Sequence, residues 1–405
     1  MKKKSKFLKF AIVLAVMILA SCDDVDEYIA ENLPNTDSSE EESGIPIGVG
    51  DFEVRAMDVS FLPQLDRDGV MFKNDENETK DLLEIIKASG VNTVRLRLWA
   101  KNTNIYGYDE VKILSDRAKA LGLKTWITIH YSDTWADLNN QKTPDDWPTS
   151  NLDELKDIVN NYTKNIVLAL DPDYVQVGNE INKGILLPLG DYDINWQNFR
   201  DLVGVGCQAV REASSKAKII MHYAGIGEGA NNFFLGLYDL DYDIIAVSYY
   251  PIYYEGKGLD YLKSSLNELN ATYRRPNVQE NGQPYDQQIP QKLELLIAEV
   301  AYPFTEDNDD QTNNIYPAAN ASLLSEFSAT REGQAAFLRG FRQTLSEIDN
   351  TLGFGYWGGE FVAFDGIDAL NGLNGSNYDN HALFFRDTGS RKSFKELPAL
   401  QEFKE

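Results

Sequence analysis

The sequence predicts an α/β protein built as a (β/α)8 barrel, the TIM barrel, on three observations. Eight short apolar runs rich in β-branched and aromatic residues recur along the chain. Segments with the apolar period of a helix, about 3.6 residues, lie between several of these runs. No glycine-rich phosphate loop follows any run, which counts against a nucleotide-binding sheet. Strands alternating with helices in this number specify a closed barrel more simply than an open doubly wound sheet.

The predicted strands are runs dominated by apolar and β-branched residues, as expected of buried strands. In chain order they are residues 54–60, 93–99, 125–130, 174–178, 218–223, 244–250, 293–300 and 353–357. The predicted helices repeat apolar residues three and four positions apart, so each can bury one face against the barrel. They are residues 80–89, 111–121, 152–170, 196–217, 259–273 and 333–349. No repeat or linker-like break divides residues 48–405, which we interpret as one barrel domain.

The residues that precede the predicted barrel begin with a targeting segment. Residues 1–21 hold five lysines within the first nine positions and then an apolar run, which is typical of an export signal and short for a bilayer span. The sequence Leu19-Ala20-Ser21-Cys22 resembles the lipobox of bacterial lipoproteins, in which cleavage leaves a lipid-carrying cysteine at the new amino terminus. The resemblance implies lipidation at Cys22 and a membrane anchor. An ordinary secretory peptide with an incidental cysteine is the alternative.

Residues 22–47 are acidic and poor in large apolar side chains, so they bury too little surface to offset the entropy of ordering. We interpret them as a disordered tether. The acidic residues directly after Cys22 also resemble the surface-export signal of lipoproteins in Bacteroidetes. We therefore expect an outer-membrane lipoprotein that faces the outside of the cell, with the periplasmic face as the alternative.

The chain is strongly acidic, with 38 lysines and arginines against 63 aspartates and glutamates and a net charge of −25. This charge argues against a nucleic-acid partner and against an anionic membrane face. An uncharged polysaccharide is unaffected by such a field. Only two cysteines occur, Cys22 and Cys207. With Cys22 acylated, Cys207 has no disulfide partner, and its apolar helical segment predicts an inert core thiol. We also expect the protein to be a monomer.

A first candidate catalytic residue follows the fourth predicted strand. The stretch from Asp173 to Asn182 begins as a buried strand and breaks at Gly178 into polar residues that include Asn179 and Glu180. In a barrel of parallel strands the carboxyl ends carry the chemistry, so Glu180 stands where an acid or a base is needed. Taken alone, a glutamate in this position is more often a solvated residue at the top of a loop.

A second carboxylate reverses that interpretation. The seventh run is apolar and places Glu299 at its end, so Glu180 and Glu299 are expected to face each other over one barrel mouth. Retaining glycosidases need such a pair, one as acid/base and one as nucleophile, about 5–5.5 Å apart. Arg97 near the nucleophile would keep it ionised, whereas burial beside a like charge would keep Glu180 protonated. Opposed surroundings would thus give the two carboxylates opposed roles.

Polar and aromatic side chains also follow the other predicted strands. Residues 93–99 alternate so that Arg95, Arg97 and Trp99 share one face, which is costly unless they meet carboxylates or a substrate. Asn179 could hydrogen-bond the sugar hydroxyl next to the reacting carbon. A histidine at a strand end, or His381 in a late loop, is more often a structural hydrogen-bonding residue than a general base. The candidate substrate-binding residues are Arg97, His130, Asp133, Trp135, Asn179, His222, Tyr249 and Trp357.

Five stretches together carry a resemblance to a known family. They are residues 90–99 (GVNTVRLRLW), 130–137 (HYSDTWAD), 175–180 (VQVGNE), 248–251 (SYYP) and 299–305 (EVAYPFT). With them the sequence resembles the family 53 glycoside hydrolases, endo-β-1,4-galactanases with catalytic glutamates after strands four and seven of a barrel. The resemblance extends from about residue 57 to 384. It implies Glu180 as acid/base, Glu299 as nucleophile, and retaining cleavage of β-1,4-galactan, the neutral side chain of pectin.

The sequence departs from the family pattern in two places. The family usually has Trp-Glu-Pro-Ala-Trp near the eighth strand, where residues 357–361 of this chain read WGGEF. Trp357 still suits a stacking platform for a sugar ring, but its neighbours differ. Residues 274–291 form a long predicted loop that could reshape the groove. Subsite number and product length are therefore open.

An acidic loop is a candidate calcium site. Residues 307–313 place oxygen-bearing side chains at alternate positions, which suits Ca²⁺, although the glycine and glutamate of an EF-hand are missing. Bacterial members of the resembled family hold calcium between the loops after strands seven and eight, which adds Ser376 and Asp379. A solvated acidic loop is the alternative, and no cofactor is expected for catalysis. The candidate ligands are Asp307, Asp309, Gln311, Asn313, Ser376 and Asp379.

Three functions remain open from the sequence. The favoured one is an endo-β-1,4-galactanase on a lipid tether. Another barrel endo-glycanase of the same clan, a mannanase or a β-glucanase, is the alternative among enzymes. A surface glycan-binding lipoprotein without turnover is the alternative of a different class, and the presence of both carboxylates, the arginine and the asparagine counts against it.

Overall fold

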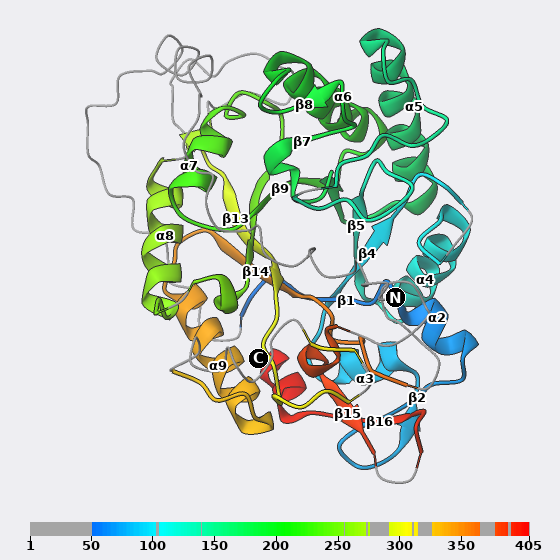
Figure 1. The fold of residues 1–405 in the computed structure, drawn as a ribbon, viewed down its shortest axis with the longest axis vertical. Coiled ribbons are helices and arrows are strands. Elements are labelled where there is room, and N and C mark those ends of the chain that lie inside the picture. The colour runs from blue at the N-terminus through cyan, green and yellow to red at the C-terminus, as the bar shows by residue number, and fades with distance from the viewer. Residues whose placement is uncertain are drawn as a thin grey trace, which may run out of the picture. The chain divides into compact units, whose positions relative to one another are not determined.

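The computed structural model describes residues 51–102, 105–138, 140–254, 256–272, 274–275, 291–309, 312–314, 326–364, 377–387 and 390–404. Eight parallel strands close into a barrel with helices around it, so the predicted (β/α)8 fold is confirmed (Figure 1). In their order around the barrel the strands are β1 (Val54–Asp58), β4 (Thr93–Leu98), β5 (Lys124–Ile129), β6 (Tyr174–Val177), β9 (Lys218–Ala224), β10 (Ile244–Tyr249), β13 (Glu294–Val300) and β14 (Thr351–Tyr356), and β14 pairs with β1.

The barrel interior is a separate apolar cluster. It is built by residues two apart on the same strand, such as Leu296 and Ala298 on β13, because alternate side chains of a strand point to the same face. Trp126 of β5 is the bulkiest fully buried side chain of this interior. Gly355 on β14 leaves room for it, since a methyl group there would stand 3.2 Å from the indole ring. The interior is therefore packed, and open chemistry is confined to the strand ends.

The helices pack their apolar faces on the outside of the barrel, where a second and larger apolar cluster lies. Their caps follow local sequence: Asn151 accepts a hydrogen bond from the backbone N–H of Glu154 at one helix start, and Thr330 does the same for Gly333 at another. The helices are α2 (Leu62–Arg67), α3 (Leu82–Ala88), α4 (Tyr108–Ala120), α5 (Leu152–Leu170), α6 (Trp196–Ala213), α7 (Glu228–Leu235), α8 (Leu259–Thr272) and α9 (Arg331–Ser346).

Smaller elements decorate the barrel. A four-stranded sheet joins β15 (Phe384–Arg386), β16 (Ser393–Glu396), β2 (Met71–Lys73) and β3 (Thr79–Lys80) in that order. Two antiparallel pairs are β7 (Gly184–Ile185) with β8 (Gly190–Asp191) and β11 (Arg274–Arg275) with β12 (Gln291–Lys292). The second pair closes the base of the long predicted loop, whose residues 276–290 lie outside the described residues. Short 3-10 helices are η1 (Ile181–Lys183), η2 (Pro251–Tyr253), η4 (Asp379–His381) and η5 (Pro398–Phe403).

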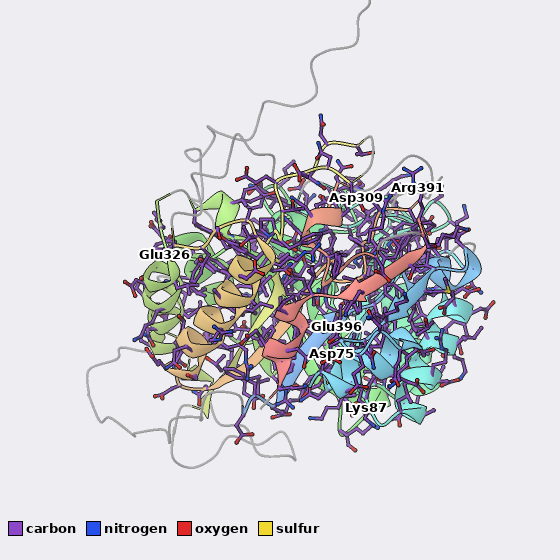
Figure 2. The ribbon with its side chains drawn as sticks, turned by 90° about the horizontal axis from the view of Figure 1, so that it is seen from below. Asp75, Lys87, Asp309, Glu326, Arg391 and Glu396 are labelled. Atoms are coloured by element: carbon purple, nitrogen blue, oxygen red, sulfur yellow. The ribbon has the colours of Figure 1, made fainter. Side chains whose placement is uncertain are left out.

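The two ends of the barrel carry different residues. In the side view of Figure 2, Asp309, from the segment after β13, lies towards one end, and Lys87, in the last turn of α3 ahead of β4, lies towards the other. At the Lys87 end, η5 packs closely under the barrel. A methyl group at Gly90 would collide with the Phe403 carbonyl oxygen, so the two backbones approach more closely than a side chain would allow. The carboxyl ends of the strands, which hold the candidate site, lie at the Asp309 end.

Two predictions about single segments can be compared with the fold. Cys207 is buried within α6, as predicted for a core residue. Cys22 and the tether 22–47 lie outside the described residues. Of the helices in the described part of the chain, none combines the length and apolar character that a membrane crossing requires.

Candidate active site

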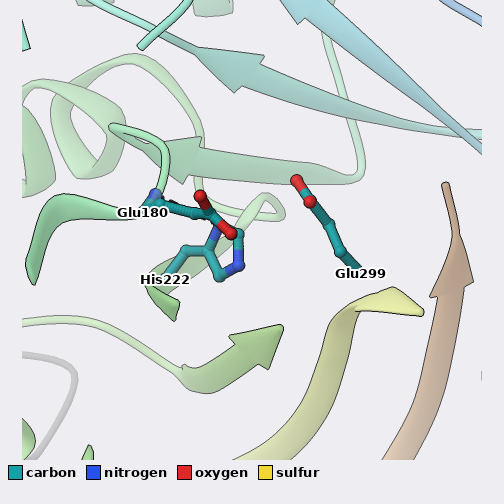
Figure 3. A group of neighbouring side chains, drawn as sticks. All are labelled: Glu180, His222 and Glu299. Atoms are coloured by element: carbon teal, nitrogen blue, oxygen red, sulfur yellow. Dashed lines mark hydrogen bonds between the residues drawn. The ribbon is translucent and has the colours of Figure 1, made fainter. Parts of the chain in front are cut away.

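Glu180 and Glu299 come together at the carboxyl ends of β6 and β13. One oxygen of Glu180, one oxygen of Glu299 and one ring nitrogen of His222 all lie within 4.8 Å of one another (Figure 3). Glu299 is 6% exposed, and Glu180 is partly exposed. A sugar linkage placed at the mouth can therefore meet both carboxyl groups, as the sequence predicts.

The turn after β6 delivers Glu180 through an unusual backbone path. Gly178 has φ +80°, and a methyl group there would stand 2.5 Å from Cγ2 of Ile181. Glu180 itself is left-handed, with φ 48° and ψ 54°, a conformation that non-glycine residues rarely adopt. Gln141 clamps this turn, since its amide nitrogen donates to the carbonyl oxygens of Asn179 at 2.8 Å and Glu180 at 3.2 Å. The strain is held in place by neighbours, as is common at functional sites.

A β-bulge delivers Glu299. Leu296 and Ala298 point into the barrel interior, so strict alternation would aim Glu299 outward at the helices. Against β10, however, Val247 pairs with Ile297 while Ser248 pairs with Glu299, which leaves Ala298 as the extra residue. Bulges of this kind re-aim a side chain, and here Glu299 turns towards the mouth.

Glu299 is held by two hydrogen-bond donors. Arg95 Nη2 lies 2.8 Å from Glu299 Oε1, and the Tyr250 hydroxyl donates to Glu299 Oε2 at 2.7 Å. Arg95 also pairs with Asp58 at 2.9 Å. Burial alone would lower the pKa of Arg95, but the charges of Glu299 and Asp58 raise it overall, so Arg95 is a permanent cation. These donors fix both oxygens of Glu299 at the mouth.

The surroundings of Glu180 favour its protonated form. Burial, and then the charge of Glu299, raise the pKa of Glu180 to about 8, while a hydrogen bond from the Ser248 hydroxyl at 2.7 Å acts in the opposite direction. At neutral pH Glu180 therefore carries a proton that it can donate. The expectation that Glu180 is protonated beside a like-charged partner agrees with this geometry.

His222 orients the groups around Glu180 and does not act as a base. Burial and the charge of Arg95 hold the pKa of His222 well below its usual value, so the ring is neutral. Its Nε2 lies 2.9 Å from the Ser248 hydroxyl and its Nδ1 lies 3.0 Å from the Gln176 amide nitrogen. Both ring nitrogens are thus engaged, and Arg95 neutralises Glu299. The group of Glu180, His222 and Glu299 therefore suits acid–base chemistry better than metal binding.

Asn179 precedes Glu180 in the chain and contacts Arg95, the residue that pairs with Glu299. Its side-chain oxygen accepts a hydrogen bond from Arg95 at 2.8 Å, and its amide nitrogen donates one to the Ala136 carbonyl at 2.9 Å. An amide nitrogen has two N–H groups, so one remains for a substrate hydroxyl. This arrangement fits the predicted contact with the hydroxyl next to the reacting carbon.

Comparison with known proteins decides the family. The family model described as glycosyl hydrolase family 53 matches residues 54–403. The chain belongs to glycosyl hydrolase family 53. A probable arabinogalactan endo-β-1,4-galactanase A from Aspergillus fumigatus is 31% identical over 321 residues, 75% of this chain and 83% of that protein. The arabinogalactan endo-β-1,4-galactanase of Thermothelomyces thermophilus is 31% identical over 319 residues, 75% and 88% of the two chains.

Solved structures agree with this family assignment. The GH53 catalytic domain from Ignisphaera aggregans superposes with a TM-score of 0.75 at 30% identity, covering 88% of this chain and 96% of that one. A structure from a study of two fungal β-1,4-galactanases gives a TM-score of 0.70 at 28% identity, covering 87% and 99%. The family 53 resemblance found in the sequence is thereby confirmed over nearly the whole barrel.

Within this family 53 barrel, the prediction that Arg97 lies beside Glu299 is wrong by two residues along β4. Arg97 does not contact Glu299; its guanidinium lies 3.7 Å from the ring centre of Trp135 and 4.9 Å from that of Tyr106. Arg95, two residues earlier on the same face, forms the ion pair with Glu299 instead. Arg97 thus supports the wall of the site by stacking on Trp135.

Tyr249 was predicted to bind substrate, and the structure contradicts this. Its side chain is 1% exposed and stacks on Phe341 of α9 at 6.3 Å, in the layer between barrel and helices. Tyr250 takes the place at the mouth and donates to Glu299. Strand parity could have identified it, because Ile244 and Ala246 point inward. Counting on by twos reaches positions 248 and 250.

Two further predicted substrate-binding residues, His130 and Asp133, follow the carboxyl end of β5. His130 is 2% exposed and accepts a hydrogen bond from the Ala136 backbone, and burial holds its pKa well below the usual value, so it supports the loop that carries Trp135. Asp133 faces a separate pocket of about 320 Å³, which Trp147 and Tyr162 also line. No structural contact yet assigns either residue to a substrate.

The departure from the family pattern after β14 has a structural reason. Trp357 is 9% exposed, and its ring packs edge-on against Tyr250 at 6.3 Å. A methyl group at Gly359 would stand 2.6 Å from Cε of Met57, so a larger residue there would displace the end of that buried side chain. Glu360 is fully buried and accepts a hydrogen bond from the Phe61 backbone at 3.2 Å. Burial and then Asp58 raise its pKa well above the usual value, so Glu360 is a neutral support for the loop after β1.

The predicted calcium ligands are only partly described. Gln311 and Ser376 lie outside the described residues. The Asp309 backbone N–H donates to Asp379 at 3.2 Å, so the loops after β13 and β14 do meet, as the family resemblance implies. However, Arg386 already pairs with Asp309 at 3.0 Å. Calcium at this place stays a prediction, as do the other candidate ligands Asp307 and Asn313.

Proposed function

We propose that this family 53 protein is a retaining endo-β-1,4-galactanase that hydrolyses the galactan side chains of pectin by double displacement. The observation that carries the proposal is the approach of Glu180 and Glu299, with oxygen atoms within 4.8 Å, in opposed surroundings. Retaining enzymes hold their carboxyl groups close together because one of them must reach the sugar directly. Inverting enzymes leave room for a water molecule instead.

In the first step, a carboxylate oxygen of Glu299 attacks the anomeric carbon, and the bond from that carbon to the glycosidic oxygen breaks. Glu180 gives its proton to that oxygen as the leaving sugar departs. A glycosyl ester of Glu299 results. Arg95 and Tyr250 hold the attacking carboxylate in place, at 2.8 and 2.7 Å. Asn179 is placed to bind the neighbouring sugar hydroxyl, a contact that strengthens in the transition state.

In the second step, Glu180 is a carboxylate and takes a proton from a water molecule. The water oxygen attacks the anomeric carbon, and Glu299 leaves as a carboxylate. Two displacements at one carbon restore its original configuration. Glu180 ends the cycle protonated, as its pKa of about 8 favours at neutral pH.

The galactan substrate is supported by the two curated relatives described above, whose names give that activity. The net charge of −25 adds a physical reason, because a neutral polymer can approach such a protein whereas an anionic one is repelled. We also propose that the enzyme is anchored to the outer membrane through a lipid on Cys22 and works outside the cell.

The proposal is tested by a time course of products from linear β-1,4-galactan, resolved by size, with the anomeric configuration of the first product read by NMR. We expect large early fragments with β configuration. Reducing sugar released from mannan or β-glucan but not from galactan would indicate a different glycanase. Galactan binding without any turnover would indicate a glycan-binding protein.

Removal of either glutamate separates binding from chemistry. We expect Glu180→Ala and Glu299→Ala to lower kcat by roughly 10²- to 10⁴-fold, because each deletes a group that acts only in the transition state. Galactan binding, measured by affinity electrophoresis, should stay near that of the wild type. Glu306→Ala, an exposed carboxylate on the loop after β13, is the matched control and should keep full activity. Wild-type turnover in either glutamate variant would contradict the assigned roles.

A further inference from the structure

Tyr253 is an exposed aromatic side chain that the mechanism above does not use. Its side chain is 59% exposed, which is unusual for a large ring and costs free energy when nothing covers it. Two other described large apolar side chains with comparable exposure, Ile113 on α4 and Leu168 on α5, belong to the outer helical layer. Tyr253 instead ends η2, which follows the carboxyl end of β10. It therefore stands at the mouth of the barrel.

Ring contacts tie Tyr253 to the reacting groups. Its ring centre lies 6.3 Å from that of Tyr250 at an interplanar angle of 86°, an edge-to-face contact. Tyr250 in turn donates to Glu299 at 2.7 Å. One side chain thus separates Tyr253 from the nucleophile. Burial, and then the charge of Glu180, raise the pKa of Tyr253, so the acid/base carboxyl group is also close.

The positions of three rings divide the mouth into two sides. Trp357 contacts Tyr250 at 6.3 Å and 86°, the same geometry as Tyr253. Trp357 follows β14 and Tyr253 follows β10, and these two strands flank β13, which carries Glu299. Tyr253 follows β10, whose Ser248 donates to Glu180. Tyr250, which touches the nucleophile, lies between the other two rings. The ring near Glu180 is on the side where the proton is delivered, and that is the side of the departing sugar.

The chemistry of galactose suits such a ring. The C–H groups at carbons 3, 4 and 5 of a β-galactosyl unit lie on one face of the sugar and make it apolar. An aromatic ring offers a flat apolar surface with a negative face, which attracts those C–H groups, and the tyrosine hydroxyl can still reach water or a sugar hydroxyl. A half-exposed tyrosine at the mouth is therefore more useful as a platform than as a core residue.

We propose that Tyr253 is the stacking platform of the leaving-group subsite, where it binds the galactosyl unit that accepts the proton from Glu180. This inference rests on the proposed galactanase function and names a binding residue for it. Tyr253 acts on the sugar that departs and on the acceptor sugar in the reverse reaction. It makes no contact with the part of the substrate that becomes the glycosyl ester.

Two substrates separate the two sides of the site. Galactotetraose fills both sides, whereas β-galactobiosyl fluoride fills only the glycone side, because its leaving group is a single atom. We expect Tyr253→Ala to lower kcat/KM on galactotetraose by about tenfold, the effect of losing one stacked aromatic contact of about 1.4 kcal/mol. On the fluoride it should stay within about twofold of wild type, by the same scale of free energy.

Matched variants complete the test. Tyr253→Phe keeps the ring and should retain most activity on galactotetraose. Leu168→Ala, at a side chain that is 63% exposed near the end of α5, should change the rate on neither substrate. Unchanged fluoride hydrolysis also shows that Tyr253→Ala folds. Equal wild-type rates on both substrates in Tyr253→Ala, or an equal loss on both, would overturn the platform. A wild-type enzyme inactive on galactan and on the fluoride would overturn the galactanase function, and this inference with it.

Discussion

Glu180 and Glu299 carry the same carboxyl group, and their neighbours set their different roles. Glu299 accepts hydrogen bonds from a permanent cation, Arg95, and from the Tyr250 hydroxyl. Burial raises the pKa of Tyr250 well above its usual value, and the charge of Glu299 raises it further, so Tyr250 keeps its proton and donates. Glu180 instead meets the charge of Glu299 with one hydroxyl donor. These opposed surroundings support the acid and nucleophile roles proposed for the two residues.

The first prediction concerns pH. Glu180 must donate a proton, and its pKa is about 8, so kcat/KM on galactan should fall as pH rises through about 8. Ser248→Ala removes a hydroxyl that stabilises the charged form of Glu180 and lowers its pKa. The basic limb of the profile should therefore move to higher pH in that variant. Ser264→Ala, on the exposed face of α8, is the control, and a limb that stays in place in Ser248→Ala would contradict the assignment.

A pair of adjacent tyrosines gives the second prediction. Tyr250→Phe removes the donor to Glu299, a hydrogen bond to a charged group worth about 1.5–3 kcal/mol, so kcat should fall roughly 10- to 100-fold. Tyr249→Phe keeps the ring that stacks on Phe341 and should stay within about twofold of wild type. Steady-state kinetics on galactotetraose measure both variants. A larger loss of kcat in Tyr249→Phe than in Tyr250→Phe would contradict this prediction and indicate that Tyr249 belongs to the site.

The sequence predicted the two glutamates that the structure brings together, but not all of their partners. The glutamates, Asn179 and His222 stand directly at predicted strand ends, where topology alone brings them together. The choice between Arg95 and Arg97 depends on height along one face of a strand, which no periodicity reports. Ser248 and Gln176 could not be assigned because their partners lie on other strands: Ser248 donates to Glu180, and Gln176 contacts His222.

At the scale of elements, two departures from regular strands aim the catalytic pair. The turn after β6 uses a glycine and a left-handed Glu180, and β13 uses a bulge at Ala298. Each element thus gives up regular geometry at the place where it supplies a reacting group. Clamps from Gln141 and from the paired strands restore the rigidity that catalysis requires.

The third prediction tests the turn after β6. Gly178→Ala adds a methyl group 2.5 Å from Ile181 at a residue with φ +80°, so stability should fall by at least about 1–2 kcal/mol. Displacement of Glu180 by even about 1 Å should lower kcat up to about 10²-fold. Gly69→Ala is the matched control, because Gly69 has φ +68° with nothing within 4 Å. It should lose stability without losing kcat, as measured by denaturant melts and kinetics.

Most elements could be predicted, and the exceptions are short elements whose local sequence signal is weak. All eight barrel strands are found within a few residues of their predicted bounds, since buried parallel strands are long apolar runs. The short helix α7 was missed because its eight residues include a glycine and two asparagines, which are weak helix formers. The sheet of β2, β3, β15 and β16 was missed because its strands are short and pair across distant parts of the chain.

At the scale of the whole molecule, the net negative charge is compatible with the neutral substrate that we propose. A charge of −25 keeps the protein soluble and repels the anionic backbone of pectin, while a neutral galactan branch feels no such force. The proposed enzyme would thus meet electrostatic repulsion at the charged backbone and none at the neutral branches. A tether of residues 22–47 would give the barrel reach to such branches from a membrane.

The last prediction tests that anchor. Wild-type protein, expressed in a lipoprotein-processing bacterium, should incorporate labelled palmitate and partition into the detergent phase, because several acyl chains hold a protein on a membrane. Cys22→Ala should lose the label and move to the aqueous phase with galactanase activity intact, since Cys22 precedes the barrel. Cys207→Ala is the matched control, because that thiol is buried in α6 and cannot be acylated in the folded protein. If the wild-type protein incorporates no label, the anchor proposal is wrong, and residues 1–21 are an ordinary secretory signal that releases a freely diffusing enzyme.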